Sequence, residues 1–198
     1  MVPMPAEPAR YSLRELLTGK VLRNRMPSAA PPRPARVQPL LRPPGALPES
    51  DFIAACTQCG DCLVACPHRT LFMAPARFGR AAASPMLDPV IQPCWMCPDT
   101  PCIASCRPHA LRGGTDAFPR IATARIEAAD CLAFQGTTCT TCVERCPSPG
   151  ALVIESGRPQ VIADRCTGCG VCQHVCPAAN NAIVMVPALR TEPPVPYL

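Results

Sequence analysis

The stretch Cys166-Thr-Gly-Cys169-Gly-Val-Cys172-Gln-His-Val-Cys176-Pro177 decides how this chain is expected to fold. Its spacing is C-x-x-C-x-x-C-x-x-x-C-P, and residues 56–67 repeat that spacing without deviation. Three thiols are crowded into seven residues, and the fourth follows within four more. This is the arrangement in which thiolates hold a cluster of four iron and four sulfide ions. The stretch therefore predicts a metal-dependent fold.

All 16 cysteines of the chain fall into four groups of four, and none is left over. In chain order the groups are Cys56, Cys59, Cys62, Cys66; Cys94, Cys97, Cys102, Cys106; Cys131, Cys139, Cys142, Cys146; and Cys166, Cys169, Cys172, Cys176. The second group has four residues between its second and third cysteines, and the third has seven between its first and second. We predict four [4Fe-4S] clusters held by all sixteen residues.

Disulfides and zinc are the alternative uses of so many cysteines. Residues 1–20 contain no apolar run of the secretory type, so a disulfide-stapled secreted scaffold is disfavoured. Zinc sites usually combine two C-x-x-C pairs across a longer loop, which differs from the crowding here. His68, His109 and His174 lie beside three of the groups, but each group already has four thiols. We expect these histidines to face solvent or to bond to sulfur.

The composition predicts a thin conventional core and a strong dependence on metal. Aromatic residues make up only 4% of the 198 residues, while 28 are proline. Four clusters would fill the interior and couple metal binding to folding. The formal charge of +5 becomes about −3 once each cluster with its thiolates contributes about −2. The sequence has no basic, aromatic-rich motif for nucleic acid and no apolar stretch long enough to span a membrane.

We expect an α+β fold of tandem bacterial-ferredoxin-like modules, with short strands and helices around the four clusters. Residues 1–50 read as a basic, proline-rich N-terminal arm with a possible short helix over 12–22. Residues 51–125 and 126–187 read as two ferredoxin-like modules, followed by a C-terminal tail over 188–198. Within the second module, residues 151–154 and 160–162 read as strands joined by a turn at Ser156-Gly157.

The spacing also suggests how the groups share clusters. In two-cluster ferredoxins the fourth cysteine of each group binds the cluster of the other group. The 20 positions between Cys146 and Cys166 suit this exchange, so we pair Cys176 with the third group and Cys146 with the fourth. By the same logic Cys106 joins the first group and Cys66 the second. A pairing of the first group with the fourth, and of the second with the third, stays open at this point.

Nothing in the sequence marks a substrate pocket, so we expect an electron carrier and not an enzyme. Phosphate-binding, dinucleotide-binding and protease motifs are all missing from the sequence. Trp95, the only tryptophan, lies between the first two cysteines of the second group. It would either shield that cluster from water, which would lower the reduction potential, or pack in the core.

The irregular groups resemble the ferredoxin-type NapF, NapG and MauM proteins, a four-cluster group linked to periplasmic nitrate reductase and methylamine utilisation. The run Cys131-Leu-Ala-Phe-Gln135 followed by Cys139-Thr-Thr-Cys142, and Leu17-Thr-Gly19 before a proline-rich run, resemble NapF. The spacing from Cys97 to Cys102 and the residues Asn181-Ala-Ile183 resemble NapG and MauM instead. The sequence begins with no twin-arginine signal, so we favour the NapF branch.

Resemblance to NapF implies a cytoplasmic accessory protein. Such a protein would meet the catalytic molybdenum subunit of periplasmic nitrate reductase, or another redox protein, and help to mature or reduce it. Resemblance to NapG or MauM implies instead an electron-transfer subunit between quinol oxidation and a periplasmic oxidoreductase. A conduit subunit of some other multi-subunit oxidoreductase is a further possibility.

Overall fold

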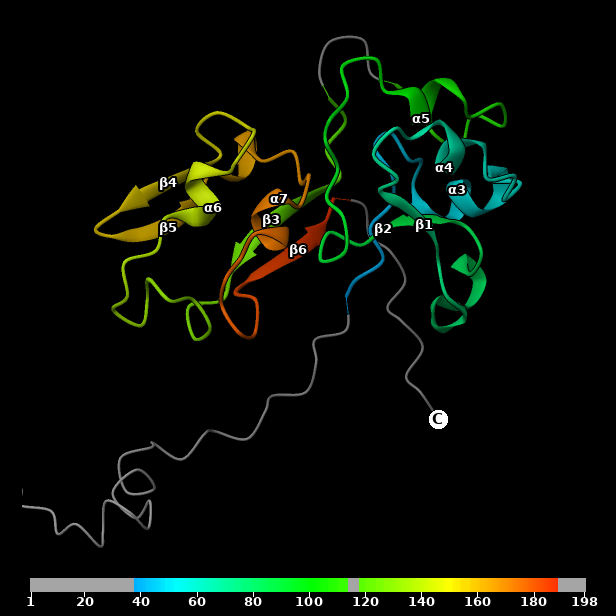
Figure 1. Ribbon diagram of the computed structural model, residues 1–198. Helices are drawn as coiled ribbons and strands as arrows, with labels where there is room; N and C mark the ends of the chain where they lie inside the picture. Colours follow the sequence, from blue (N-terminus) through cyan, green and yellow to red (C-terminus); the bar gives the residue numbers. More distant parts are fainter. Residues whose placement is uncertain (1–37, 114–117, 189–198) are drawn as a thin grey trace, which may run out of the picture. The chain divides into compact units, whose positions relative to one another are not determined.

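The computed structural model describes residues 38–113 and 118–188 (Figure 1). The possible helix over 12–22, most of the predicted arm and the tail from residue 189 lie outside the described residues. We keep the name module 1 for the part that holds the first two cysteine groups, and module 2 for the part that holds the last two. Both modules combine very short helices with very short strands.

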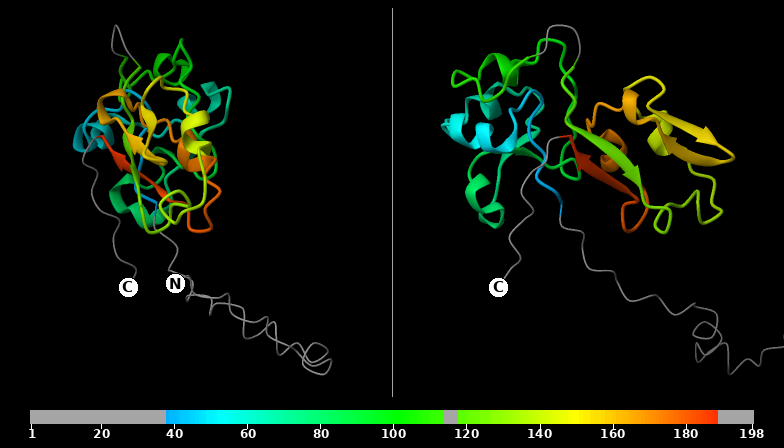
Figure 2. Two further views of the ribbon diagram at one scale, coloured as in Figure 1. Left: turned by 90° about the vertical axis from the view of Figure 1, so that its left-hand side faces the viewer. Right: turned by 180° about the vertical axis from the view of Figure 1, so that it is seen from behind.

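Module 2 consists of two strand pairs, which we name by their order along the chain. The first and last strands of the module form the outer pair, and the two strands between them form the inner hairpin. The outer strands β3 (Ala122–Ile126) and β6 (Ile183–Pro187) are antiparallel, with Ala124 opposite Met185, and lie side by side in Figure 2. The inner hairpin joins β4 (Leu152–Glu155) to β5 (Arg158–Val161). A 3-10 helix, η2 (Ala163–Arg165), follows the hairpin, and the helices α6 (Thr141–Glu144) and α7 (Val171–His174) complete the module. The hairpin and its turn confirm the sequence prediction for residues 151–162.

Module 1 has a corresponding inner hairpin, but its two strands are joined by a longer connection. Strand β1 (Leu71–Met73) pairs with β2 (Pro85–Leu87), and the 3-10 helix η1 (Ala76–Ala81) lies between them. Helices α3 (Glu49–Ala55), α4 (Asp61–Ala65) and α5 (Pro101–Ala104) hold or flank the cysteines. No second two-stranded pair like β3 and β6 occurs among the described residues of this module.

Residues 38–48, which we call the strap, take the place of the outer strand pair in module 1. They were expected to belong to a loose proline-rich arm, with structure resuming near residue 51. The structure instead shows single β-bridges from Leu41 to Leu87 and from Ala46 to Leu111. Leu40 and Leu41 are buried. Prolines exclude a helix here but allow an extended segment, so burial of the two leucines anchors the strap against the module.

The strap is also anchored by a buried ion pair. The Arg42 guanidinium donates to both carboxylate oxygens of Glu49, with Nε–Oε2 at 2.9 Å and Nη2–Oε1 at 2.5 Å. Arg42 also donates to the Ser84 hydroxyl and the Pro85 carbonyl, and its guanidinium lies 4.4 Å from the centre of the Phe52 ring. Because every charge is paired, the strap can bury an arginine.

The cysteines themselves form much of the core. One apolar cluster joins buried cysteines of both modules to large side chains such as Phe52, Leu111 and Met185. A smaller cluster of Leu40, Phe78 and Met86 lies under the strap and η1. The mixture of helix with short strands agrees with the expected α+β class. In the described residues, no helix is long and apolar enough to cross a membrane.

Candidate metal centres

The structure brings the sixteen cysteines together in four sets, and each set takes its fourth member from the neighbouring group. Set 1 is Cys56, Cys59, Cys62, Cys106; set 2 is Cys94, Cys97, Cys102, Cys66; set 3 is Cys131, Cys139, Cys142, Cys176; and set 4 is Cys166, Cys169, Cys172, Cys146. These are the sets that the sequence predicted from group spacing. The alternative that pairs the first group with the fourth does not occur.

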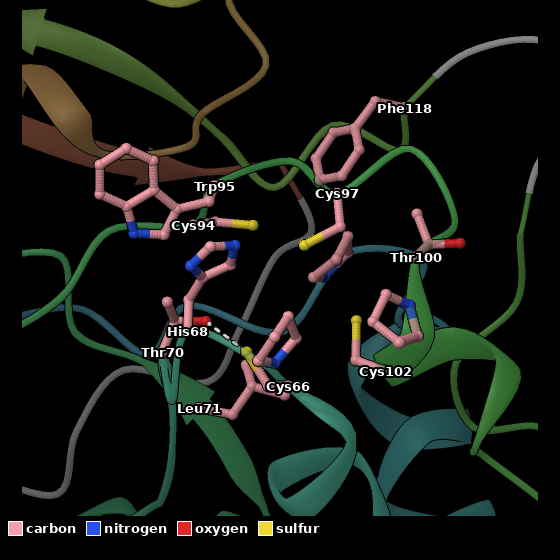
Figure 3. Close-up of a pocket in the computed structure, with 13 residues that line it drawn as sticks. Cys66, His68, Thr70, Leu71, Cys94, Trp95, Cys97, Thr100, Cys102 and Phe118 are labelled. Carbon is pink, nitrogen blue, oxygen red and sulfur yellow. Dashed lines mark hydrogen bonds between the residues drawn. The ribbon is translucent and has the colours of Figure 1, made fainter.

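Three of the sets line a cavity of their own. In set 2, Figure 3 shows the four sulfur atoms turned toward a common space beside His68, Trp95 and Phe118. Sets 1 and 4 line similar cavities. In set 3, Cys131, Cys139 and Cys176 lie close enough to Cys142 to act on its charge, and these three pack in one apolar cluster with Ala133.

The local backbone explains why the third cysteine of every group points inward. Each one is the second residue of a helix of only four or five residues, and each is buried; they are Cys62, Cys102, Cys142 and Cys172. Such short helices are stable only through their tertiary contacts. The fourth cysteine follows just beyond each helix, where the chain turns toward the neighbouring set.

A left-handed residue shapes the first loop of three groups. Gln58, Met96 and Gly168 each stand two positions after the first cysteine, and all have φ between 51° and 77°. This conformation tightens the loop so that successive thiols face the same side. Group three has no such residue at this position, because seven residues in place of two separate its first two cysteines and form a wider turn.

Burial and mutual repulsion oppose charge on the inner thiols. Burial, followed by the nearby thiolates of Cys106, Cys56, Cys102 and Cys59, raises the pKa of Cys62 to about 12. The same two causes raise the pKa of Cys142 to about 11, with Cys139, Cys131 and Cys176 as the neighbouring thiolates. Burial likewise raises the pKa of Cys94 to about 12. Thiolates in such sets need a cationic partner in their midst, which an iron–sulfur core would supply.

The sets of each module are neighbours. Cys102 of set 2 raises the pKa of Cys62 in set 1, and Cys142 of set 3 acts in the same direction on Cys172 in set 4, in both cases after burial and other thiolates. Sets 2 and 4 also meet, since the Cys94 N–H donates to the Cys169 carbonyl at 2.9 Å. The sets therefore follow one another in the order 1, 2, 4, 3.

Several sulfur atoms receive hydrogen bonds of the kind that stabilise a thiolate. Backbone N–H groups donate to Cys106 from Leu111 at 3.3 Å, and to Cys176 from Ala182 at 3.4 Å. Cys166 lies 3.5 Å from the donor N–H of Ala124. These donors would reach the ligand sulfurs of a bound cluster and raise its reduction potential.

Cys66 differs from the buried thiols of the sets. Burial acts to raise its pKa, but hydrogen bonds from the Thr70 hydroxyl and from the N–H groups of Thr70, His68 and Arg69 outweigh it, so the pKa lies below its usual value. The Thr70 hydroxyl is 3.3 Å from the sulfur, as drawn in Figure 3. The Thr70 side chain, which belongs to module 1, thus stabilises the Cys66 thiolate.

The donor sets fit four-iron clusters. All sixteen cysteines lie in the described residues and are free thiols. In those residues, no group of three or more His, Cys, Asp or Glu side chains is placed to hold a single metal ion. Four thiolates around a shared cavity are the donors that a cubane cluster requires, one for each iron.

The remaining predicted residues lie at the surface. His68, His109 and His174 are exposed, as expected. Trp95 is 53% exposed, so the prediction that it packs in the core is wrong; it lines the set 2 cavity with its ring centre 5.5 Å from that of His68. Phe118 also lines that cavity. Sequence reasoning missed Phe118 because it lies outside every cysteine group.

Paired short-strand modules with exchanged fourth cysteines define an iron–sulfur protein of the ferredoxin type. The family described as a 4Fe-4S binding domain matches residues 157–178. The chain belongs to the ferredoxin-type NapG/MauM group of electron-transfer proteins. The methylamine utilization ferredoxin-type protein MauM of Paracoccus denitrificans is 39% identical over 162 residues, which cover 74% of this chain and 71% of MauM.

Other relatives separate the branches of the group. The ferredoxin-type protein NapG of Escherichia coli is 37% identical over 162 residues, covering 74% of this chain and 70% of NapG. The ferredoxin-type protein NapF of Haemophilus influenzae is 32% identical over 149 residues, covering 73% of this chain and 78% of NapF. The preference for NapF drawn from the sequence is therefore not supported, and NapG and MauM fit better. No solved structure matches the chain.

Proposed function

We propose that this chain carries four [4Fe-4S] clusters, each held by one of the four cysteine sets, and passes single electrons along them. The observation that carries the proposal is the exchange of fourth cysteines, which gives four complete sets of four thiols with none unused. The uninterrupted order of the sets, 1, 2, 4, 3, supports a series of neighbouring redox sites. When bound, each cluster would accept and release one electron.

The chain's own residues hold and tune the sites. The short helices bury the third cysteine of each group, so water is kept from the inner side of each set. The N–H groups of Leu111 and Ala182 stabilise negative charge on Cys106 and Cys176. The Thr70 hydroxyl does the same for Cys66. Reduction adds negative charge, so these donors favour the reduced state.

We propose a NapG/MauM-like place for the protein, as an electron-transfer subunit between quinol oxidation and a periplasmic oxidoreductase. The name of MauM links that relative to methylamine utilization, and it is 39% identical to this chain. The partner would be another redox protein. A cytoplasmic location and the catalytic molybdenum subunit of nitrate reductase as the partner belong to the other reading, the NapF-like one, and both stay predictions.

Reconstitution under anaerobic conditions tests the proposal. The full chain should bind about sixteen iron and sixteen sulfide ions, and show reduced [4Fe-4S] signals in electron paramagnetic resonance (EPR) spectra. A Cys106→Ser/Cys66→Ser double variant, altered in sets 1 and 2, serves as the comparison and should lose iron from module 1 only. About twelve iron ions or fewer in the unaltered chain would contradict the proposal of four clusters.

A further inference from the structure

One peptide unit in module 1 is held from both sides. The peptide between Ala110 and Leu111 accepts a hydrogen bond through its carbonyl from the N–H of Leu47, at 3.0 Å. The N–H of the same peptide donates to the Cys106 sulfur at 3.3 Å. Ala110 and Leu111 are almost completely buried. The strap therefore fixes the direction in which this N–H points.

A second contact holds the strap in place at its tightest point. The N–H of Arg112 donates to the Gly45 carbonyl at 2.7 Å. Gly45 has φ +76°, and a Cβ atom there would lie 2.2 Å from the Arg112 carbonyl oxygen and 2.9 Å from Cδ1 of Ile103. Only glycine allows so close an approach of the two backbones. Gly45 thus determines how near the strap lies to the residues that follow Cys106.

Module 2 positions its corresponding donor by other means. There the Ala182 N–H donates to Cys176 at 3.4 Å, and the carbonyl of the next peptide, between Ala182 and Ile183, accepts from the N–H of Glu127 at 2.8 Å. Ala182 directly precedes β6, which pairs over five residues with β3. In module 1 only the Ala46–Leu111 bridge and the adjoining hydrogen bonds replace that strand pair. The donor on Cys106 therefore depends on a few strap residues.

We propose that the strap, through Gly45 and Leu47, positions the Leu111 N–H on the Cys106 sulfur and thereby raises the reduction potential of the cluster in set 1. A hydrogen bond to a ligand sulfur stabilises the more negative reduced state. Leu47 acts through the Ala110–Leu111 peptide and Gly45 through the next peptide, Leu111–Arg112, and neither acts by touching the set itself. The inference rests on the proposed function, since it requires a cluster in set 1.

The first experiment compares two glycine substitutions in the reconstituted full chain. Gly45→Ala pushes the strap away from Arg112. Gly157→Ala is the matched control, because Gly157 has the same φ of +76° but nothing within 4 Å of an added Cβ. In redox titrations followed by EPR, Gly45→Ala should keep the full iron content and shift one of the four potentials to a more negative value. Gly157→Ala should shift none.

A second variant removes the donor itself, in case Gly45→Ala does not load fully. Replacing Leu111 by its α-hydroxy analogue, introduced by nonsense suppression, exchanges the N–H for an ester oxygen and keeps the side chain. The same transition should move to a more negative potential as in Gly45→Ala. Four unchanged potentials in a fully loaded Leu111 ester variant would overturn the inference. Iron and sulfide contents of the unaltered chain test the proposed function separately, and a chain without clusters would overturn both.

Discussion

Module 1 and module 2 hold their cysteines in the same exchanged sets, yet they close the fold around them differently. Module 2 joins β3 to β6 over five residue pairs, whereas module 1 uses the strap and two isolated bridges. Each module has an inner hairpin and two short helices that carry the third cysteines of its groups. In both modules a backbone N–H group therefore donates to a fourth cysteine, Cys106 or Cys176. A regular outer strand pair is only one way to hold that N–H group in position.

Glycine at position 168 is required in module 2 but its counterpart in module 1 is not a glycine. A Cβ on Gly168 would lie 2.1 Å from the backbone nitrogen of Ala122 in β3, while Gln58 holds the equivalent place with φ 57°. We expect Gly168→Ala to prevent module 2 from closing and to lower the bound iron from about sixteen to about eight per chain. Iron analysis after anaerobic reconstitution measures this.

Gln58→Ala is the matched control, because the side chain is exposed and the backbone already adopts the left-handed conformation. It should retain all iron and change the denaturant midpoint by less than the equivalent of about 0.5 kcal/mol. Full iron content in Gly168→Ala would show that module 2 can bind its clusters without the close approach between β3 and the loop of the fourth cysteine group.

The first segment of each module carries an arginine–glutamate pair, and the two pairs differ in burial. Arg42 in the strap and Glu49 at the start of α3 are 3% and 8% exposed, whereas Arg125 in β3 and Glu127 just after it are 64% and 32% exposed. We expect Glu49→Ala to cost about 3–5 kcal/mol, because it leaves a buried guanidinium without its partner. Anaerobic denaturant unfolding, followed by the visible absorbance of the clusters, measures the loss.

Glu127→Ala should cost less than about 1 kcal/mol in the same assay, since water screens the exposed pair. Equal losses from the two variants would mean that the strap is not anchored by its ion pair. The strap would then be held by the burial of Leu40 and Leu41 and by its backbone hydrogen bonds.

Thr100 offers a smaller test of the cysteine loops. It stands before α5 with φ 38°, at the place where Gly60 and Gly170 precede α4 and α7. The left-handed conformation costs a non-glycine residue about 1–2 kcal/mol, and glycine loses about 0.5–1 kcal/mol in chain entropy. Thr100→Gly should therefore stabilise module 1 by up to about 1 kcal/mol, measured as a higher denaturant midpoint.

The reverse change, Gly60→Thr, should destabilise the same module by about 1–2 kcal/mol, because only Cε of Met73 lies within 4 Å of an added Cβ and strain dominates. A loss from Thr100→Gly would show that the threonine side chain stabilises the loop in a way that its backbone conformation does not reveal.

The cysteine spacing predicted the site better than the fold around it. Group spacing gave the exchanged sets, because crowded thiols leave few ways to share a cluster. The hairpin at residues 152–161 followed from two short apolar runs and the turn between them. The β3–β6 pair and the strap were missed because both join residues far apart in the chain. The prolines of residues 38–48 led to the prediction of an arm that packs against nothing. The adjacent leucines Leu40 and Leu41 were the sequence signal that this segment is buried against the module.

The exchange of fourth cysteines decides which thiols share a cluster, and serine substitutions combined with EPR test this exchange most directly. Cys106 belongs to set 1 with Cys62, although Cys102 is its neighbour in the sequence. Serine at a ligand position alters the signal and potential of one cluster. We predict that Cys106→Ser and Cys62→Ser perturb one and the same EPR signal, and that Cys102→Ser perturbs a different one. If Cys106→Ser instead perturbs the signal that Cys102→Ser perturbs, the exchange is contradicted.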